Sequence, residues 1–215
     1  NAEGFYDEPG AAQSKDSPYY NWFNFTNWPN KYDAWWGIRT LPAVNENHPD
    51  YRDFIITGKD SVVRHWLRAG ASGWRLDVAD ELPDIFLDAL RRRVKIADED
   101  AIIIGEVWED ATNKVAYGAR RRYLLGKQLD AVMNYPWRSA IIDYVLTCDA
   151  HLFCSRIKEL MEHYPKPALD CLMNLLSSHD TARILNVLGV TKHVAHEEAA
   201  TYRMTDEEYA RGKKK

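Results

Sequence analysis

Three acidic residues each stand at the carboxyl end of a short, strand-like run. Asp77 ends the run GWRLD, Glu106 ends IIIGE and Asp180 ends LLSSHD. In a barrel of parallel strands the carboxyl ends of all strands open onto one face, so three such acids would meet there. Two carboxyl groups are enough to cleave a glycosidic bond, one as nucleophile or base and the other as acid. The three acids are therefore the candidate catalytic groups.

Each acid also has a structural explanation that the sequence leaves open. Asp77 and Arg75 are two residues apart and share one face of a strand, so they could form a buried ion pair and nothing more. Glu106 could cap the turn that follows it. Asp180 could cap a helix that begins at Thr181. The occurrence of all three acids at strand ends favours the catalytic interpretation.

The neighbours of two of the acids suggest different chemical roles. A nearby positive charge keeps a carboxylate ionised, as a nucleophile requires, and Arg75 would do this for Asp77. Apolar surroundings raise the pKa of a carboxyl group, as a general acid requires. Glu106 follows the apolar run Ile102–Gly105. We therefore expect the two acids to differ in function.

Strand-like and helical patterns alternate from residue 60 to residue 189. Strands are expected over residues 73–79, 102–108, 129–135 and 171–180. Helices are expected over residues 60–70 with Asp60 as cap, from Leu82-Pro83 with an apolar stripe of Phe86, Leu90 and Val94, in parts of the arginine-rich segment after residue 108, and over residues 137–146, 151–164 and 181–189. This alternation indicates a parallel sheet covered by helices. No Gly-rich phosphate loop follows a strand, so an α/β barrel is favoured over a nucleotide-binding fold.

Composition excludes several classes of protein. The chain has 215 residues and a net charge of -4, which argues against a nucleic-acid or anionic-membrane partner. No apolar run approaches the roughly 20 residues that span a bilayer. The three cysteines lack the spacing of a zinc site or a disulfide framework, so we expect buried thiols, a reducing compartment and a cytoplasmic location. They are Cys148, Cys154 and Cys171.

Aromatic residues are unusually frequent, with 8 Trp and 12 Tyr. Many lie in YYNWFNFTNWPNKYDAWWG, residues 19–37, where they alternate with Asn, Asp and Lys. This pattern is compatible with a loop packed by its own aromatic side chains. It is equally compatible with a sugar-binding surface, because aromatic faces stack on pyranose rings.

Four motifs connect these observations to a known family. GWRLDVADE (73–81), GEVWED (105–110) and NLLSSHDTAR (174–183) resemble the motifs of strands four, five and seven in the α-amylase family, glycoside hydrolase family thirteen. WWGIRTLPAVN (35–45) resembles a motif of its neopullulanase, cyclomaltodextrinase and maltogenic amylase group, near the end of domain B, the loop excursion after strand three. The resemblance covers residues 1–189.

The resemblance implies a role for each of the three acids. Asp77 corresponds to the nucleophile that forms a β-glycosyl intermediate. Glu106 corresponds to the general acid that then acts as base for water. Asp180 corresponds to the acid that binds sugar hydroxyls and stabilises the transition state. The reaction implied is cleavage or transfer of α-glucosidic bonds with retention of configuration.

The resemblance also implies roles for substrate-binding residues. Arg75 would orient Asp77, and His179 would bond hydroxyl groups of the same sugar. Glu81 and Trp108 correspond to contacts on the acceptor side. The group often has Asn where this chain has Asp80. This departure puts the acceptor preference in doubt.

Several parts of the family's barrel are missing from the sequence. The strand-three motif, Asp-x-x-x-x-Asn-His, is absent, and strands one, two and eight are not found. A complete barrel takes about 250 residues. We therefore expect an internal segment of the catalytic domain: a partial (β/α)8 barrel of about strands four to seven, with part of domain B. The expected divisions are residues 1–50 for domain B, 51–189 for the barrel and 190–215 for a charged excursion.

A partial barrel has consequences for partners and activity. It leaves sheet edges and helix faces uncovered, so the chain should need the missing barrel segments or associate with itself, and should be inactive alone. The expected ligand is an α-glucan such as a maltodextrin, cyclodextrin or pullulan, with α-1,4 or α-1,6 bonds. Many family members use Ca2+, but no compact ligand set commits this chain to a metal. A transglycosylase or branching enzyme of the same family and a non-catalytic α-glucan-binding protein remain as alternatives.

Overall fold

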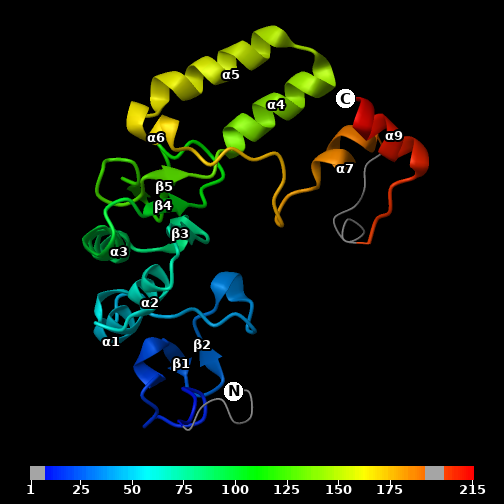
Figure 1. The fold of residues 1–215 in the computed structure, drawn as a ribbon. Coiled ribbons are helices and arrows are strands. Elements are labelled where there is room, and N and C mark those ends of the chain that lie inside the picture. The colour runs from blue at the N-terminus through cyan, green and yellow to red at the C-terminus, as the bar shows by residue number, and fades with distance from the viewer. Residues whose placement is uncertain (1–7, 192–200) are drawn as a thin grey trace. The chain divides into compact units, whose positions relative to one another are not determined.

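The computed structural model describes residues 8–191 and 201–215, which fall into two compact units (Figure 1). Unit 1 is formed by Asn1–Trp74 and Glu81–Ile102, and unit 2 by Arg75–Asp80 and Ile103–Lys215. Six of the seven predicted site residues belong to unit 2, and Glu81 belongs to unit 1.

Unit 1 contains the helices that precede the strand at residues 102–105. They are α1 (Pro49–Arg52), a π-helical turn (Asp53–Thr57), α2 (Val62–Arg68) and α3 (Asp84–Ala97). The predicted stripe of α3 is confirmed, because Phe86, Leu90 and Val94 are all buried. Pro83 is the N-cap residue of α3, one position before the first turn that we expected it to occupy.

The N-cap position of helix α2 lies one residue after Asp60, the residue predicted to occupy it. Ser61 occupies the N-cap position, and Asp60 instead forms an ion pair with Arg68 at 3.1 Å. The prediction that Asp60 caps this helix is therefore wrong. The end of the helix is close to the expected place, because Gly70 has a left-handed φ of 102° that interrupts the helical path.

The aromatic-rich segment forms short elements packed by their own rings. They are η1 (Tyr20–Trp22), β1 (Phe25–Asn27), β2 (Lys31–Tyr32) and η2 (Trp35–Gly37). Tyr20 stacks on Phe25 with ring centroids 5.3 Å apart, and Phe25 meets Tyr32 edge-on at 6.0 Å. These contacts support the self-packed loop, and a sugar-binding role for this segment stays a prediction.

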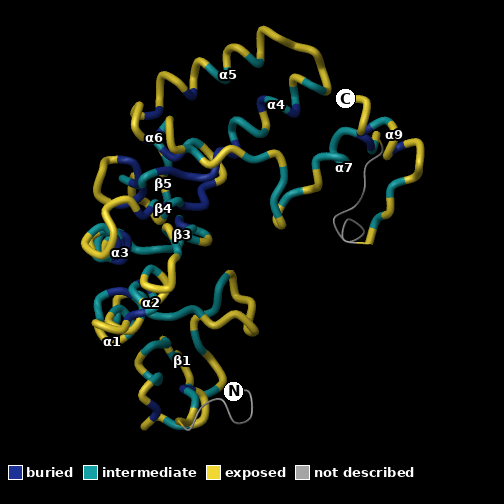
Figure 2. The backbone as a smooth tube through the Cα atoms, in the orientation of Figure 1, coloured by how far each residue is buried: buried dark blue, intermediate teal, exposed yellow. Residues whose placement is uncertain are grey.

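The central sheet has the strand order β3-β4-β7. The strands are β3 (Gly73–Leu76), β4 (Ile102–Gly105) and β7 (Ala131–Val132), each shorter than predicted. β4 and β7 are parallel, with Ile104 opposite Ala131 and Gly105 opposite Val132. Ile103, Ala131 and Val132 are fully buried, and buried positions gather around this part of the backbone in Figure 2.

The arginine-rich segment after β4 is a β-hairpin and turns, so the expected helical parts are not found. Strands β5 (Val115–Ala116) and β6 (Ala119–Arg120) pair antiparallel around Tyr117 and Gly118. Both turn residues have positive φ, 53° and 76°, as a two-residue hairpin turn of this hand requires. The short turn prevents the chain from continuing as a helix.

Helices follow the sheet directly, and the fourth predicted strand does not form. α4 (Tyr135–Thr147) and α5 (Ala150–His163) form where helices were predicted and pack against each other, and α6 (Lys166–Asp170) follows. Residues 171–180 make only a single parallel bridge, between Met133 and Met173. The neighbouring strand β7 is itself only two residues long, and the contact with this segment does not extend beyond the one bridge.

The last described residues form a helical pair. α7 (Ile184–Gly189) packs against α9 (Asp206–Lys214), and a Cβ at Gly189 would meet the Glu208 carbonyl oxygen at 2.2 Å. The two helices therefore approach closely through a glycine. All three cysteines are exposed, so the expectation of buried thiols is wrong. Within the described ranges, no helix is both long enough and apolar enough to cross a bilayer.

Candidate active site

The turn after β3 brings its backbone to the Glu106 carboxylate. Val78 has a left-handed φ of 40°, a conformation that costs a β-branched residue about 1–3 kcal/mol. In this conformation the Val78 N–H donates to Oε2 of Glu106 at 2.8 Å, and the Ala79 N–H donates to the Glu106 carbonyl at 3.1 Å. Local strain is thus used to fix the turn that carries Asp77 against Glu106.

Glu106 is buried, with only 4% of its side chain exposed, but its surroundings are not apolar. Besides the Val78 N–H, its carboxylate accepts a hydrogen bond from the Trp108 indole at 3.1 Å and pairs with Arg75 at 3.2 Å. The apolar surroundings expected for this carboxyl group from the preceding sequence are therefore not found. The alternative that Glu106 caps the turn after it is also not observed, because its partners are Val78, Trp108 and Arg75.

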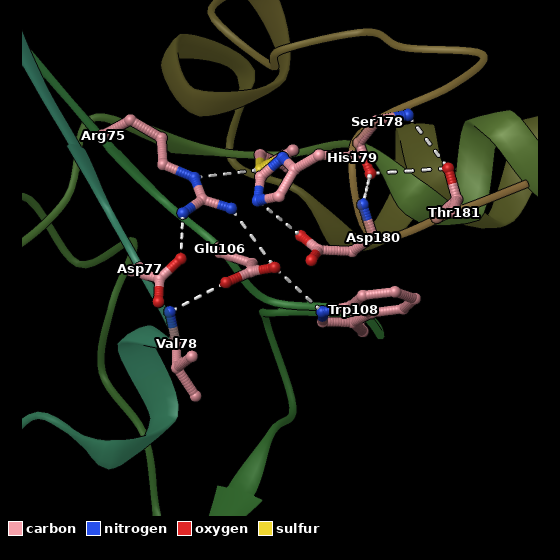
Figure 3. Close-up of polar contacts among 10 residues, drawn as sticks. Arg75, Asp77, Val78, Glu106, Trp108, Ser178, His179, Asp180 and Thr181 are labelled. Carbon is pink, nitrogen blue, oxygen red and sulfur yellow. Dashed lines mark hydrogen bonds and ion pairs between the residues drawn. The ribbon is translucent and has the colours of Figure 1, made fainter. Parts of the chain in front are cut away.

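Arg75 joins the first two candidate acids (Figure 3). One guanidinium nitrogen, Nη1, forms an ion pair with Asp77, and Nη2 faces Glu106. Its Nε contacts the Met133 sulfur at 3.4 Å, which fixes the guanidinium from a third side. Asp77 is 72% exposed, so its carboxylate is open to a ligand while its position is set by Arg75. The pairing of Arg75 with Asp77 was predicted, whereas the bridge to Glu106 was not.

The third acid lies on the segment before α7. Figure 3 shows the Asp180 carboxylate on the side of Glu106 and Trp108. The Asp180 N–H donates to the Ser178 hydroxyl at 3.2 Å, and His179 Nε2 lies 3.1 Å from the Asp180 carboxylate. The N-cap position of α7 is Arg183, so the alternative that Asp180 caps that helix is wrong.

Tyr135 is a site residue that sequence reasoning missed. Its ring stacks on Trp108 with centroids 4.4 Å apart and planes within 7°. Burial raises the pKa of its hydroxyl, contact with Ser178 partly offsets this, and the charges of Glu106 and Asp180 raise it further. The hydroxyl makes no hydrogen bond of good geometry within the described part of the chain. Tyr135 therefore interacts electrostatically with two of the candidate acids, which lie on different segments of the chain.

A signal for Tyr135 exists in the sequence. It follows Asn134 in MNYP at the end of the third predicted strand, which is where barrel site residues lie. The Asn134 side chain accepts from the Trp137 N–H at 3.2 Å and donates to Asn174 at 2.8 Å. Asn134 thus caps α4 and joins the start of that helix to the segment that leads to Asp180.

Glu81, the remaining predicted site residue, lies in unit 1. There its carboxylate accepts a hydrogen bond from the Trp36 indole at 3.5 Å. Trp36 is 75% exposed, stacks on Trp35 and has a left-handed φ of 49°. No grouping of three or more His, Cys, Asp or Glu side chains suitable for a metal ion occurs among the described residues.

This geometry defines a particular chemical capacity. An exposed carboxylate and a buried carboxylate share one guanidinium, and a stacked pair of aromatic rings lies beside the buried one. Such a pair provides one group that can reach a substrate carbon and another that is shielded from solvent. Hydrolysis of a glycoside uses two carboxyl groups, one as nucleophile or base and the other as acid.

Comparison with known proteins identifies the family. The model of the α-amylase catalytic domain matches residues 5–207, which is most of the chain and extends past the resemblance seen in the motifs. The chain belongs to the α-amylase catalytic domain family. The predicted fold, a partial (β/α)8 barrel, is confirmed by this match and by related solved structures.

Curated relatives act on α-glucans, as their names state. A cyclomaltodextrinase of Bacillus sp is 36% identical over 179 residues, which cover 79% of this chain and 30% of that protein. Neopullulanase 2 of Thermoactinomyces vulgaris is 32% identical over 82% of this chain and 30% of its own length. The chain therefore spans about a third of the length of these relatives.

Solved structures agree with this assignment. A cyclic α-maltosyl-(1→6)-maltose hydrolase from Arthrobacter globiformis, in complex with maltose, matches with a TM-score of 0.73 and 29% identity. The match covers 82% of this chain and 39% of that one. A cyclomaltodextrinase structure matches with a TM-score of 0.68 and 35% identity over 80% of this chain and 29% of that one.

Proposed function

We propose that the protein is a retaining α-glucan hydrolase that uses Asp77 as nucleophile and Glu106 as acid and base. The observation that carries this proposal is the single guanidinium of Arg75, which joins an exposed Asp77 to a buried Glu106 in a chain of the α-amylase family. The substrate class is the α-1,4-linked, and also α-1,6-linked, glucans represented among its relatives.

The first step forms a covalent intermediate. A carboxylate oxygen of Asp77 attacks the anomeric carbon, the bond from that carbon to the glycosidic oxygen breaks, and Glu106 gives its proton to the departing oxygen. Arg75 holds both carboxyl groups during this exchange. Asp180 and His179 bind hydroxyl groups of the same sugar, and the charge of Asp180 stabilises the positive charge that develops on the ring.

The second step releases the product. Glu106, now ionised, removes a proton from water, and the water oxygen attacks the anomeric carbon from the face that the first leaving group vacated. The bond to Asp77 breaks, and the starting configuration is restored. If a sugar hydroxyl takes the place of water, the same groups perform transfer. Glu81 and Trp108 are proposed as the contacts of that acceptor.

We also propose the division of the chain predicted from its sequence. Residues 1–50 would be part of domain B, residues 51–189 part of the barrel and residues 190–215 an excursion. The missing barrel segments or self-association would complete the fold. The three exposed, free thiols support a reducing location such as the cytoplasm.

The test is release of reducing sugar from β-cyclodextrin, pullulan and maltotetraose. It is run on the 215-residue chain and on a barrel completed with the segments that flank the matched region in the Bacillus cyclomaltodextrinase. We expect turnover in the completed barrel, and a loss of about a thousandfold or more in Asp77→Asn, because covalent catalysis requires the carboxylate. A completed barrel that folds and binds maltotetraose but releases no sugar would overturn the proposal in favour of a glucan-binding protein.

A further inference from the structure

One lysine in unit 2 lies between two carboxylates from different loops. The Lys114 ammonium is 3.0 Å from the Asp80 carboxylate and also forms an ion pair with Glu109. The other oxygen of Asp80 accepts a hydrogen bond from the Tyr123 hydroxyl at 2.6 Å. Lys114 and Tyr123 therefore hold Asp80 together.

The two carboxylates that Lys114 contacts lie on the loops that carry the proposed catalytic acids. Asp80 is three residues after Asp77, and Glu109 is three residues after Glu106. A single ammonium thus joins the loop that follows the proposed nucleophile to the loop that follows the proposed acid. The backbone bonds from Val78 and Ala79 to Glu106 join the same loops nearer the sheet. The ion pairs of Lys114 are thus a second link between the two loops, farther from the sheet than the bonds to Glu106.

The lysine is presented by a well-defined piece of backbone. It immediately precedes the hairpin β5–β6, and its carbonyl accepts from the Arg121 N–H at 2.8 Å. Its side chain is 19% exposed and that of Asp80 is 24% exposed. Partial burial lowers the pKa of Lys114, but its contacts with Glu109 and Asp80 more than offset this, and the pKa is raised. Lys114 is therefore cationic at neutral pH.

The residue at position 80 fits this interpretation. The resembling group often has Asn there, and an amide oxygen could still accept from Tyr123. An amide cannot provide the negative charge that Lys114 meets at 3.0 Å. Asp80 and Lys114 thus form a charged pair, and replacement of Lys114 leaves the mostly covered Asp80 carboxylate without this counter-charge, whereas Lys114 would still pair with Glu109 if Asp80 were replaced.

We propose that Lys114 is a positioning residue that fixes the acceptor side of the site and thereby sets the ratio of transfer to hydrolysis. The two expected acceptor contacts are next in sequence to the carboxylates it holds: Glu81 follows Asp80, and Trp108 precedes Glu109. The group bound on the acceptor side is a sugar hydroxyl, which competes with water for attack on the glycosyl intermediate. The inference rests on the proposed function, which it deepens.

The test compares three substitutions in the completed barrel. Lys114→Met keeps the length of the side chain without its charge, and Lys114→Arg keeps the charge. Lys158→Met is the matched control, because Lys158 is exposed on α5 and pairs with Glu162 at 3.6 Å. Maltotriose serves as donor and glucose as added acceptor, and the rates of transfer and hydrolysis are measured together.

We expect Lys114→Met to change the ratio of transfer to hydrolysis by about fivefold or more, with partial recovery in Lys114→Arg and no change in Lys158→Met. Asp80→Asn should change the ratio in the same direction, and the double variant with Lys114→Met should add little, since the two act through each other. Equal losses of both rates with an unchanged ratio would overturn the proposal and leave Lys114 as a stabilising residue.

A second measurement does not depend on turnover. In Lys114→Met, amide hydrogens of residues 77–81 and 106–110 should exchange about tenfold faster, in both segments together, and Lys158→Met should leave them unchanged. Unchanged exchange in either segment would overturn the link between the loops. A wild-type protein that is inert on every glucan overturns the proposed function, while this comparison still decides whether Lys114 joins the loops.

Discussion

Two of the candidate acids and the third are held in different ways. Glu106 receives contacts from Val78, Trp108 and Arg75, and Arg75 also holds Asp77. Asp180, by contrast, is hydrogen-bonded or ion-paired in the described structure only to its neighbours Ser178 and His179. The first pair of acids is fastened across separate loops, and the third stands on a locally folded segment.

This difference follows from the sheet. β3 and β4 are hydrogen-bonded neighbours, and each ends one residue before its acid, Asp77 or Glu106. The segment that leads to Asp180 touches β7 through the single bridge at Met173. Half of the site is therefore preorganised by strand pairing. The other half depends on local turns and on the stacked ring of Tyr135 nearby, so the two halves should respond differently to substitution.

The largest effect is expected at the preorganised half. Glu106→Gln replaces a carboxylate by an amide that can neither donate the same proton nor pair with Arg75, and the rate should fall by about a thousandfold. The free energy of unfolding should also fall, by about 1–3 kcal/mol, because the amide N–H2 would face existing donors. Initial rates on maltotetraose and urea unfolding measure both. Glu162→Gln on α5 is the control, and equal rates in the two variants would break the comparison.

A steric change beneath Glu106 should come next. A Cβ at Gly105 would meet Cδ1 of Leu129 at 2.4 Å and Cβ of Ala79 at 3.2 Å. Gly105→Val should therefore lower the free energy of unfolding by about 1–3 kcal/mol, through overpacking. Ala119→Val, on an exposed hairpin strand, should change it by less than about 0.5 kcal/mol. If the two variants unfold at the same urea concentration, the strand end is not the fixed element described here.

A smaller effect on stability is expected at the local half. The Thr181 hydroxyl accepts a hydrogen bond from the Ser178 N–H at 2.9 Å. Thr181→Val keeps the shape without the acceptor, so the free energy of unfolding should fall by about 1 kcal/mol or less. Because this turn orients Asp180, the KM for maltotetraose should rise by about three- to tenfold with the melting temperature nearly unchanged. A loss of stability as large as that of Gly105→Val would contradict the local account.

The smallest effect concerns the outer side of the loop after β4. Partial burial raises the pKa of Asp110, but hydrogen bonds from Thr112 and His163 offset this, and its pKa is lowered. Contact with Asp110 raises the pKa of His163, and Glu159 and Glu162 add to this. Because its pKa is raised, protonated His163 contributes fully to the free energy of unfolding below about pH 6.5. This contribution is lost as the pH rises through the pKa of the folded state.

Asp110, whose pKa is lowered, contributes to stability in the opposite pH direction. Its contribution is present above about pH 4 and is lost as the pH falls through the folded value. The difference in melting temperature between wild type and His163→Gln should therefore be greater at pH 6 than at pH 9. His151→Gln, on the first turn of α5, is the control. A difference that is constant from pH 6 to pH 9 would show that this ion pair does not fasten the loop.

Much of the fold could be predicted because it depends on local patterns. The stripe Phe86, Leu90 and Val94 marks α3 at helical spacing, and the apolar run before Glu106 marks β4. Such patterns reflect burial, which tertiary structure rarely reverses in long periodic segments. The strand expected over residues 171–180 was wrong, because this segment makes only the bridge between Met173 and Met133, and apolar composition alone does not form a ladder.

The environment of each acid was harder to predict. The sequence around Glu106 is apolar, yet the groups that reach its carboxylate come from Val78, Arg75 and Trp108, and their approach is set by the turn after β3. Tyr135 likewise enters through the stacking of segments distant in sequence. Residue types and spacing identified the acids, whereas the contacts that control them depend on three-dimensional packing.

The measurement that tests the central claim most directly is azide rescue of two variants, Asp77→Gly and Glu106→Ala, in the completed barrel with α-maltosyl fluoride as donor. Fluoride departs without a proton donor, so azide replaces it in both cases. We predict that Glu106→Ala gives the α-azide, because azide attacks an intermediate held on Asp77, and that Asp77→Gly gives the β-azide by direct displacement. The same anomer from both variants, or the reverse pattern, would contradict the assignment of the two acids.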